Sequence, residues 1–184
     1  MSRLTIYRDD SPLLAELDTS EELRIQQALA GINVRFERWA AQRPLTSTDQ
    51  DADILTAYRP EIQRLERAQS FQSVDVLRCL PDHPQKSQLR AKFLAEHTHD
   101  DDEVRFFVEG AAMFYLHAAQ RVHMVLCERN DLISVPAGMR HWFDMGPDPY
   151  FTVIRLFTTP DGWVARFTGD SIATRFPAFA RQAA

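Results

Sequence analysis

Five short runs of strand-forming residues fill the second half of the chain and constrain its fold more than any other feature. From residue 103 onward they read EVRFFVE, AMFYLHA, RVHMVLCE, DLISVP and YFTVIRLF, and the turns between them hold Gly, Pro, Asn or Asp. Strands at such nearly regular spacing are typical of an antiparallel sandwich or barrel. We therefore predict a mainly β fold of one of these two kinds.

The segment before residue 94 carries mostly helical signals. Thr19 and Glu22 have the spacing of a capping box, and the apolar periodicity that follows predicts a helix after Thr19. Residues 49–69 predict a second helix, broken or kinked at Pro60. Pro84 opens a third, short helix.

Outer strands are predicted for LTIY near the start, VRF at 34–36 and SVDVLRCL at 73–80. No repeat, low-complexity stretch or linker interrupts the chain, so we predict a single domain over residues 1–184. Its expected parts are helices and outer strands in 1–93, a β core in 94–168, and a C-terminal helix and tail in 169–184.

Composition excludes several classes of function. The formal net charge is −5 and no basic run occurs, so we expect no nucleic-acid partner. No apolar run approaches the roughly 18 residues of a membrane span, and MSRLTIYRDD is too polar for a signal peptide. Cys79 and Cys127 are too few for a disulfide framework and are expected to be reduced. A cytoplasmic protein is predicted.

The stretch HTHDDDEVRFFVEG, residues 97–110, is the clearest chemical signal. Side chains of a strand alternate between faces, so His97 and His99 point the same way, and Glu103 joins them if residues 100–102 form a bend. Two imidazoles and a carboxylate on one surface begin a transition-metal site. The alternative is a solvated acidic loop with two incidental histidines.

A metal site of this kind needs a ligand from a second strand. The stretch ISVPAGMRHWFDMG, residues 133–146, supplies His141 just beyond a Pro-Ala-Gly turn that would return the chain toward the first strand. His83, His117 and His123 are predicted to be structural or surface residues.

These segments carry a resemblance to the cupins. HTHDDDEVRFFVEG fits the first cupin motif, and PAGMRH fits the second. Two positions depart from the second motif: Asn130 stands where it usually has glycine, and Met145 stands where it often has asparagine. More closely, EHTHDDDEVRFFVEG, CERNDLISVPAG, HWFDMG and GWVARFTGD resemble the acireductone dioxygenase family. The likeness covers most of the chain and is loosest before residue 50. It implies a cupin (double-stranded β-helix, jelly-roll) barrel, mainly β, with N-terminal helices packed outside.

The resemblance also implies a ligand set and a reaction. His97, His99, Glu103 and His141 would hold one Fe(II) or Ni(II) per chain, and Co(II) or Mn(II) also suit these donors. The family cleaves 1,2-dihydroxy-3-keto-5-methylthiopentene with dioxygen in methionine salvage. The iron form gives 2-keto-4-methylthiobutyrate and formate; the nickel form gives 3-methylthiopropionate, formate and carbon monoxide.

Further residues are assigned around these ligands. The family gives the position of Arg105 the stabilisation of the substrate dianion, and Arg155, which interrupts an apolar strand face, is a possible second cation. The pocket residues expected from the resemblance are Phe93, Phe143 and Trp163. Glu96 and Asp102 flank the ligands, where the family links them to metal incorporation, and could accept hydrogen bonds from ligand imidazoles.

Two alternatives keep the same metal ligands. One is another cupin oxygenase or a metal-dependent isomerase, and the other is a non-catalytic cupin that binds a small ligand. The pair Arg105 and Arg155 beside an open metal speaks for an enzyme. Acireductone and dioxygen are the expected partners, and a monomer is expected.

Overall fold

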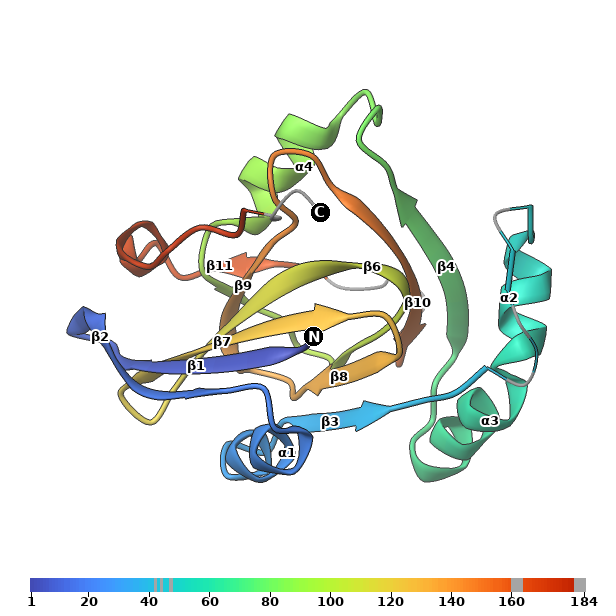
Figure 1. Ribbon diagram of the computed structural model, residues 1–184, viewed down its shortest axis with the longest axis horizontal. Coiled ribbons are helices and arrows are strands. Elements are labelled where there is room, and N and C mark those ends of the chain that lie inside the picture. The colour runs from blue at the N-terminus through green and yellow to red at the C-terminus, as the bar shows by residue number, and fades with distance from the viewer. Residues whose placement is uncertain (42, 44, 47, 160–163, 181–184) are drawn as a thin grey trace.

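The computed structural model describes residues 1–41, 43, 45–46, 48–159 and 164–180. In this part of the chain the strands form an eleven-stranded sheet that curves around an interior, with helices on its outside (Figure 1). The strands are β1 (Arg3–Arg8), β2 (Ser11–Thr19), β3 (Arg35–Arg38), β4 (Ser73–Cys79), β5 (His97–Thr98), β6 (Glu103–Ala118), β7 (Arg121–Glu128), β8 (Asp131–Val135), β9 (Arg140–Asp144), β10 (Tyr150–Phe157) and β11 (Arg166–Phe167). The helices are α1 (Glu22–Ala30), α2 (Asp51–Ala57), α3 (Arg59–Ala68) and α4 (Lys86–Phe93), with a short 3₁₀ helix at Ile172–Arg175.

The strand order brings the two ends of the predicted core together. Neighbouring strands run β11-β5-β9-β6-β7-β1-β2, while β10 pairs with β4 and β6, and β8 pairs with β3 and β6. The pairings are antiparallel, as predicted. The strand β6 therefore lies at the centre and contacts four other strands.

The sequence predicted that Gly110 separates two strands, but in the structure it lies within a single strand. EVRFFVE and AMFYLHA form the single strand β6, and its register against β10 shifts opposite Thr152 and Val153. The shift leaves Val108 as an extra residue, which makes a β-bulge. Gly110 takes a φ of +75° there, and the strand exchanges partners at this point: β8 pairs before it, and β7 and β9 pair after it.

The helices match their predicted positions better than their predicted ends. The break at Pro60 is confirmed, because α2 ends at Ala57 and α3 begins at Arg59. The capping box at Thr19 and Glu22 is wrong: the N-cap of α1 is Glu21, and the Thr19 hydroxyl accepts its backbone N–H instead. The C-terminal helix shrinks to the 3₁₀ turn Ile172–Arg175, since the residue before a proline disfavours helical geometry and Pro177 follows.

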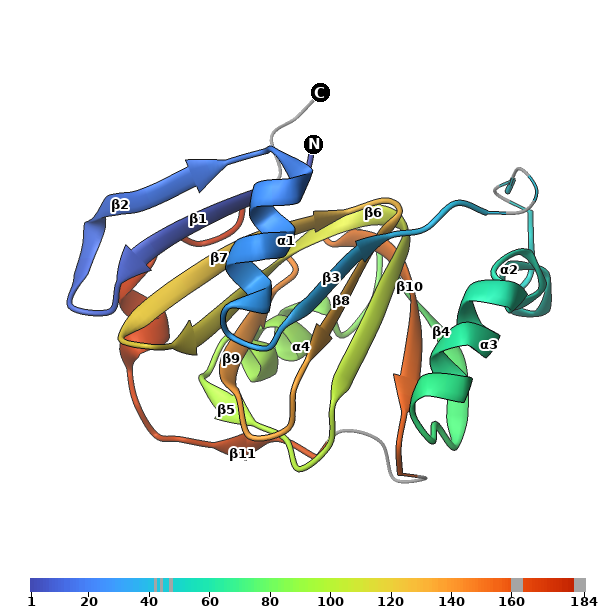
Figure 2. The same cartoon turned by 90° about the horizontal axis from the view of Figure 1, so that it is seen from below.

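The prediction from sequence missed the edge strand β2. Its sequence SPLLAELDT contains Pro12, which argues against a central strand but is tolerated at an edge. Leu13 and Leu14 are 95% and 74% exposed there. Figure 2 shows this hairpin projecting beside α1, away from β5 and β11 at the other end of the strand order.

The N-terminal half and the β core share one hydrophobic interior. A single buried cluster joins Leu4, Ile25 and Phe36 to Phe107 and Phe114. Outside the sheet, α1 packs on β3, α2 on β4 and α4 on β9 (Figures 1 and 2). The division of the single domain into three parts, with boundaries at residues 93/94 and 168/169, stays a prediction. Among the described helices, none combines the length and the apolar character that a transmembrane span needs.

Candidate metal centre and its cavity

Four buried side chains from three parts of the sheet converge inside the molecule. His97 lies on β5 and His141 on β9, and the two residues are direct cross-strand partners. Glu103 opens β6, and His99 lies in the connection between β5 and β6. The four side chains come from separate elements, yet their donor atoms all lie within 4.8 Å of one another.

The contacts between these side chains show which atoms face the common centre. Nε2 of His99 and Nε2 of His141 lie 3.0 and 3.1 Å from Oε2 of Glu103. The ring of His97 lies 4.5 Å from that of His141 and 5.0 Å from that of His99, measured between centroids. The carboxylate and the three rings therefore surround one small space.

Main-chain carbonyls fix the orientation of each ring. Nδ1 of His97 donates to the carbonyl of Ala95 at 2.7 Å, and Nδ1 of His141 donates to that of Met139 at 2.8 Å. Nδ1 of His99 donates to the carbonyl of Val164 at 3.1 Å. With the proton on Nδ1, each Nε2 presents a lone pair, which is the form of imidazole that binds metals. Three such nitrogens and one carboxylate fit a divalent transition-metal ion.

The local electrostatics favour the metal-binding forms of His97 and Glu103, but not that of His99. Burial lowers the pKa of His97 to about 4, and the neighbouring His141 acts in the same direction. Burial acts to raise the pKa of Glu103, but the charge of Arg105 and the hydrogen bonds of two imidazoles hold it well below its usual range. For His99, burial acts to lower the pKa and Glu103 outweighs it, so the pKa is raised. Glu103 is thus a carboxylate and His97 is neutral.

Arg105 is buried directly beside this cluster. It is 5% exposed, and its Nε lies 2.7 Å from Oε1 of Glu103. Its guanidinium also lies 4.3 Å from the ring centroid of Phe143, 5.4 Å from that of Phe114 and 6.0 Å from that of Phe93. Burial lowers the pKa of Arg105, and the charge of Glu103 opposes this effect. Arg105 therefore faces the interior of the sheet, on the same side as Glu103.

A cavity of about 470 Å³ opens beside the four-residue cluster. Its wall includes His97, His99, Glu103 and Arg105, together with the predicted pocket residues Phe93 and Phe143. Apolar side chains from β4, from the segment just after β9 and from β10 continue the wall: Leu77, Cys79, Met145 and Phe151. The third predicted pocket residue, Trp163, lies outside the described residues.

Arg155 also lines this cavity, but it forms an ion pair with the carboxylate of Asp75. Its Nε and Nη2 lie 2.8 and 2.6 Å from the two oxygens of Asp75, directly opposite on β4. On its other side Arg155 is the cross-strand partner of Arg105. The expectation of a second cation in the wall agrees with its position, and the pairing with Asp75 lessens the charge it offers.

Among the described residues, the Nδ1 atoms of the three candidate ligand imidazoles bond to backbone carbonyls and not to Glu96 or Asp102, contrary to one part of the expectation. Glu96 instead bonds to His117 and Thr168, and Asp102 accepts from the side chain of Gln69 and the backbone of Ala137. The reason is that Glu96 neighbours His97 along a strand, so their side chains leave opposite faces.

The prediction from sequence did not identify some of the residues that line the cavity. Met145 has the same strand parity as His141 and Phe143, and this spacing could have identified it. Cys79 lines the cavity, since β4 pairs with β10 in a register that no local pattern reveals. Asp75 was missed for the same reason. Both cysteines are free and buried, as predicted for reduced thiols.

Comparisons with known proteins agree on one family. Residues 3–165 match the ARD/ARD' family. An acireductone dioxygenase from Parvibaculum lavamentivorans is 55% identical over 179 residues, which cover 97% of this chain and 97% of the relative. An acireductone dioxygenase from Pseudomonas aeruginosa is 54% identical over 179 residues, covering 96% of this chain and 98% of the relative.

A solved structure shows the same fold. It is an acireductone dioxygenase from Bacillus anthracis with a cadmium ion in its active center, and it matches with a TM-score of 0.79 at 27% identity. The match covers 91% of this chain and 98% of that one. The predicted cupin fold, mainly β with peripheral helices, is thereby confirmed.

Proposed function

The chain belongs to the acireductone dioxygenase family, and on that premise we propose that it cleaves 1,2-dihydroxy-3-keto-5-methylthiopentene with dioxygen. The observation that carries the proposal is the convergence of three imidazoles and one carboxylate on the wall of a 470 Å³ cavity, beside a buried arginine. We propose His97, His99, Glu103 and His141 as the ligands of one Fe(II) or Ni(II). Such an ion, held by these residues, would supply Lewis-acid and redox chemistry for the reaction of the substrate with dioxygen.

Arg105 completes the charge balance of the proposed complex. A divalent ion with the Glu103 carboxylate carries about +1, and a substrate dianion brings the sum to about −1. A buried net charge is costly, so the Arg105 guanidinium, packed against Phe143, stabilises the dianion by bringing the sum near zero. Because arginine holds its proton firmly, it does so without protonating the substrate.

The remaining wall of the cavity suits an apolar tail. Phe93 and Phe143 shield the reacting part of the substrate from water, while Cys79, Met145 and Leu77 offer a sulfur-rich and aliphatic surface to the methylthio group. Burial raises the pKa of the Cys79 thiol, so this group stays neutral and does not compete for the metal.

The identity of the metal decides between two proposed outcomes. With Fe(II) the products are 2-keto-4-methylthiobutyrate and formate. With Ni(II) they are 3-methylthiopropionate, formate and carbon monoxide. In both cases the products contain the atoms of the substrate and one dioxygen molecule, so no further reductant is required. We propose that this reaction serves methionine salvage and that the enzyme is a cytoplasmic monomer.

The test is reconstitution of the metal-free protein with one metal at a time. Protein reloaded with Fe(II) is expected to consume one dioxygen per acireductone and to form the keto acid and formate. Binding without loss of the substrate's ultraviolet absorbance under air would instead support the non-catalytic cupin. His141→Ala is expected to lose the metal, whereas His83→Ala, which removes a cavity-lining side chain outside the four-residue cluster, retains it. Equal metal content in the two variants would remove His141 from the ligand set.

A further inference from the structure

The side chain of Glu96 is fully buried, and no step of the proposed reaction uses it. Its exposed fraction is 0%, and its two oxygens each have a donor. Oε1 accepts from Nδ1 of His117 at 2.5 Å, and Oε2 accepts from the hydroxyl of Thr168 at 2.7 Å. Removing a carboxylate from water costs several kcal/mol unless hydrogen bonds and charge compensate it. The buried position of Glu96 therefore depends on these two partners.

His117 connects this carboxylate to a second one. Its other nitrogen, Nε2, faces Oδ2 of Asp9 at 3.3 Å, in the turn after β1. Both ring nitrogens of His117 therefore face a carboxylate oxygen, Nδ1 that of Glu96 and Nε2 that of Asp9. His117 thus forms a bridge between a fully buried carboxylate and one that is 31% exposed.

The strand next to this bridge is short. β5 contains only His97 and Thr98; it pairs with β9 through the single pair His97 and His141, and with β11 through the pairs Thr98–Arg166 and His97–Phe167. Glu96 precedes this strand directly and lies between His97 and Ala95, whose carbonyl orients the His97 ring at 2.7 Å. A shift of Glu96 would therefore move both the backbone of His97 and the carbonyl that sets its tautomer.

The other side of the bridge, His117, lies on the same strand as Glu103 of the candidate metal centre. His117 lies on β6, which starts at Glu103, and its neighbour Leu116 is the cross-strand partner of His141. The bond between His117 and Glu96 reaches past β9 and ties β5 to β6 directly. We propose that His117 is a positioning residue for the metal centre, which holds β5 so that the three imidazoles converge. The proposal rests on the proposed function, because it takes His97 as a metal ligand.

Two substitutions separate the two contacts of His117. In His117→Asn the amide nitrogen takes the place of Nδ1 and keeps a donor toward Glu96. In His117→Gln the amide nitrogen takes the place of Nε2 and keeps a donor toward Asp9 instead. The measured quantity is the affinity of the metal-free protein for Co(II), obtained by competition with a coloured chelator. We expect His117→Gln to bind Co(II) about tenfold more weakly and His117→Asn to stay within about threefold of the wild type.

His123→Gln is the matched control. His123 is as buried as His117, lies on the adjacent strand β7 and faces Leu116, but its contact is a 3.4 Å approach to a backbone carbonyl. Its substitution is expected to leave Co(II) affinity within about twofold, because it removes no partner of Glu96. Wild-type affinity in both His117 variants would overturn the proposal. So would equal losses in the Asn and Gln variants, or an equal loss in His123→Gln, since either result indicates a general packing effect.

Two further measurements keep the outcome decisive. If the His117 variants do not fold, as judged by circular dichroism, Thr168→Val removes the other donor of Glu96 from an exposed position. We expect it to weaken Co(II) binding about threefold, and unchanged binding would overturn the proposal. If the wild type binds no Co(II), or His141→Ala binds as tightly as the wild type, the proposed ligand set fails. If only the His117 variants behave as the wild type, the positioning role alone fails.

Discussion

Arg105 carries a charge at a nearly fully buried position, and its neighbours make that position tolerable. Glu103 supplies the opposite charge at 2.7 Å, and the face of Phe143 lies 4.3 Å from the guanidinium. In the metal-free protein each member of the Arg105–Glu103 pair compensates the other. In the proposed complex the metal takes over Glu103, and the arginine serves the substrate.

Arg105→Ala is expected to lower kcat/KM about 100-fold while leaving metal content within about twofold. The same substitution should destabilise the metal-free protein by about 3 kcal/mol, because it leaves the Glu103 carboxylate buried without its cation. Metal analysis, steady-state kinetics and urea unfolding test these points. Arg105→Lys keeps a charge but loses the planar contact with Phe143, so its kcat/KM and its stability should lie between those of the wild type and of Arg105→Ala. Loss of metal from Arg105→Ala would make its role structural.

His97 gives the metal-free protein a pH-dependent stability. Its pKa is about 4 when folded and near 6.5 when unfolded, so between these values only the unfolded chain takes up the proton. Stability should therefore decrease as pH falls from about 6.5 to about 4, by up to about 3 kcal/mol from this group. Urea unfolding of chelator-treated wild type and His97→Gln across that range measures the effect. A difference between them that stays constant with pH would contradict it.

At the scale of elements, the bulge in β6 makes one long strand serve two sets of neighbours. A Cβ atom at Gly110 would lie 1.8 Å from the carbonyl oxygen of Tyr150, which is far inside contact distance. The bulge bends the strand, so its first part, with Glu103 and Arg105, faces the cavity while its second part pairs with β7 and β9.

Gly110→Ala is therefore expected to lower the free energy of unfolding by about 3 kcal/mol or more, since backbone on β10 has to move. Gly169→Ala is the matched control: its φ of +78° is nearly the same, but nothing lies within 4 Å of an added Cβ. It should cost only the backbone penalty of about 1–2 kcal/mol. Urea unfolding compares the two. Equal costs would mean that the contact with Tyr150 is relieved without strain.

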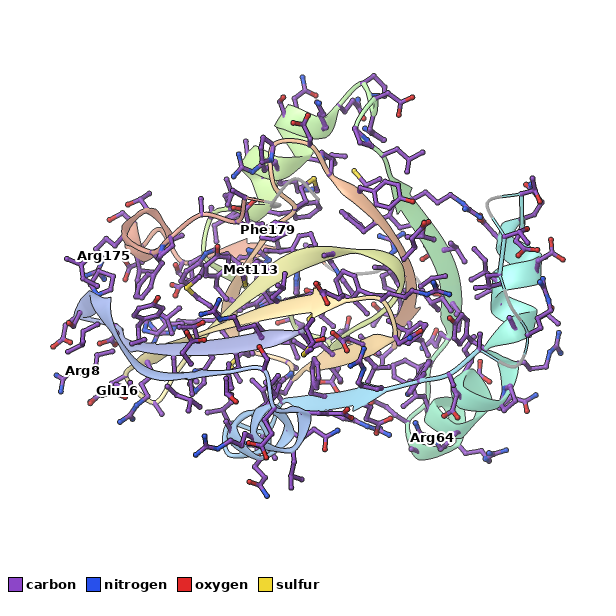
Figure 3. All side chains as sticks on the ribbon, viewed as in Figure 1. Arg8, Glu16, Arg64, Met113, Arg175 and Phe179 are labelled. Carbon is purple, nitrogen blue, oxygen red and sulfur yellow. The ribbon has the colours of Figure 1, made fainter. Side chains whose placement is uncertain are left out.

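At the scale of the whole molecule, Asp144 joins three distant segments. Its carboxylate accepts from Nε and Nη2 of Arg90 on α4 at 2.7 and 3.0 Å. It also accepts from the backbone of Gly146 in the following turn at 2.8 Å, and from that of Phe179 near the C-terminus at 2.9 Å. Phe179 lines a surface groove together with Met113 of β6 (Figure 3). The carboxylate thus holds α4, which carries Phe93, over the cavity.

Asp144→Asn is expected to destabilise the protein by about 3 kcal/mol, because Arg90 loses its anion in a buried setting. It should also raise KM more than it lowers kcat, since α4 supplies cavity residues but no metal ligand. Asp148→Asn is the control, because Asp148 pairs with Lys86 of the same helix but is 73% exposed. Its effect should stay within about 0.5 kcal/mol. Urea unfolding and steady-state kinetics compare the two variants. Similar changes in stability and KM for Asp144→Asn and Asp148→Asn would show that Asp144 does not hold α4 over the cavity.

The sequence alone determined the mainly β character of the fold and the four candidate ligands. Alternation places His97 and His99 on one face, and Glu103 and Arg105 continue the same parity, because backbone geometry imposes a period of two. The Pro-Ala-Gly turn before His141 could be read in the same local way. These features depend on residues a few positions apart, and a single chain displays them.

Only the tertiary structure decided which side chains compensate one another. Asp75 meets Arg155, and Glu96 meets His117, through strand registers that bring together residues 80 and 21 positions apart. The fusion of two predicted strands at Gly110 likewise depended on β10, whose pairing tolerates a bulge. Register and strand order result from the packing of the whole interior, so no local pattern encodes them. This is why the four candidate ligands were visible in the sequence, while the side chains that pair with their neighbours were not.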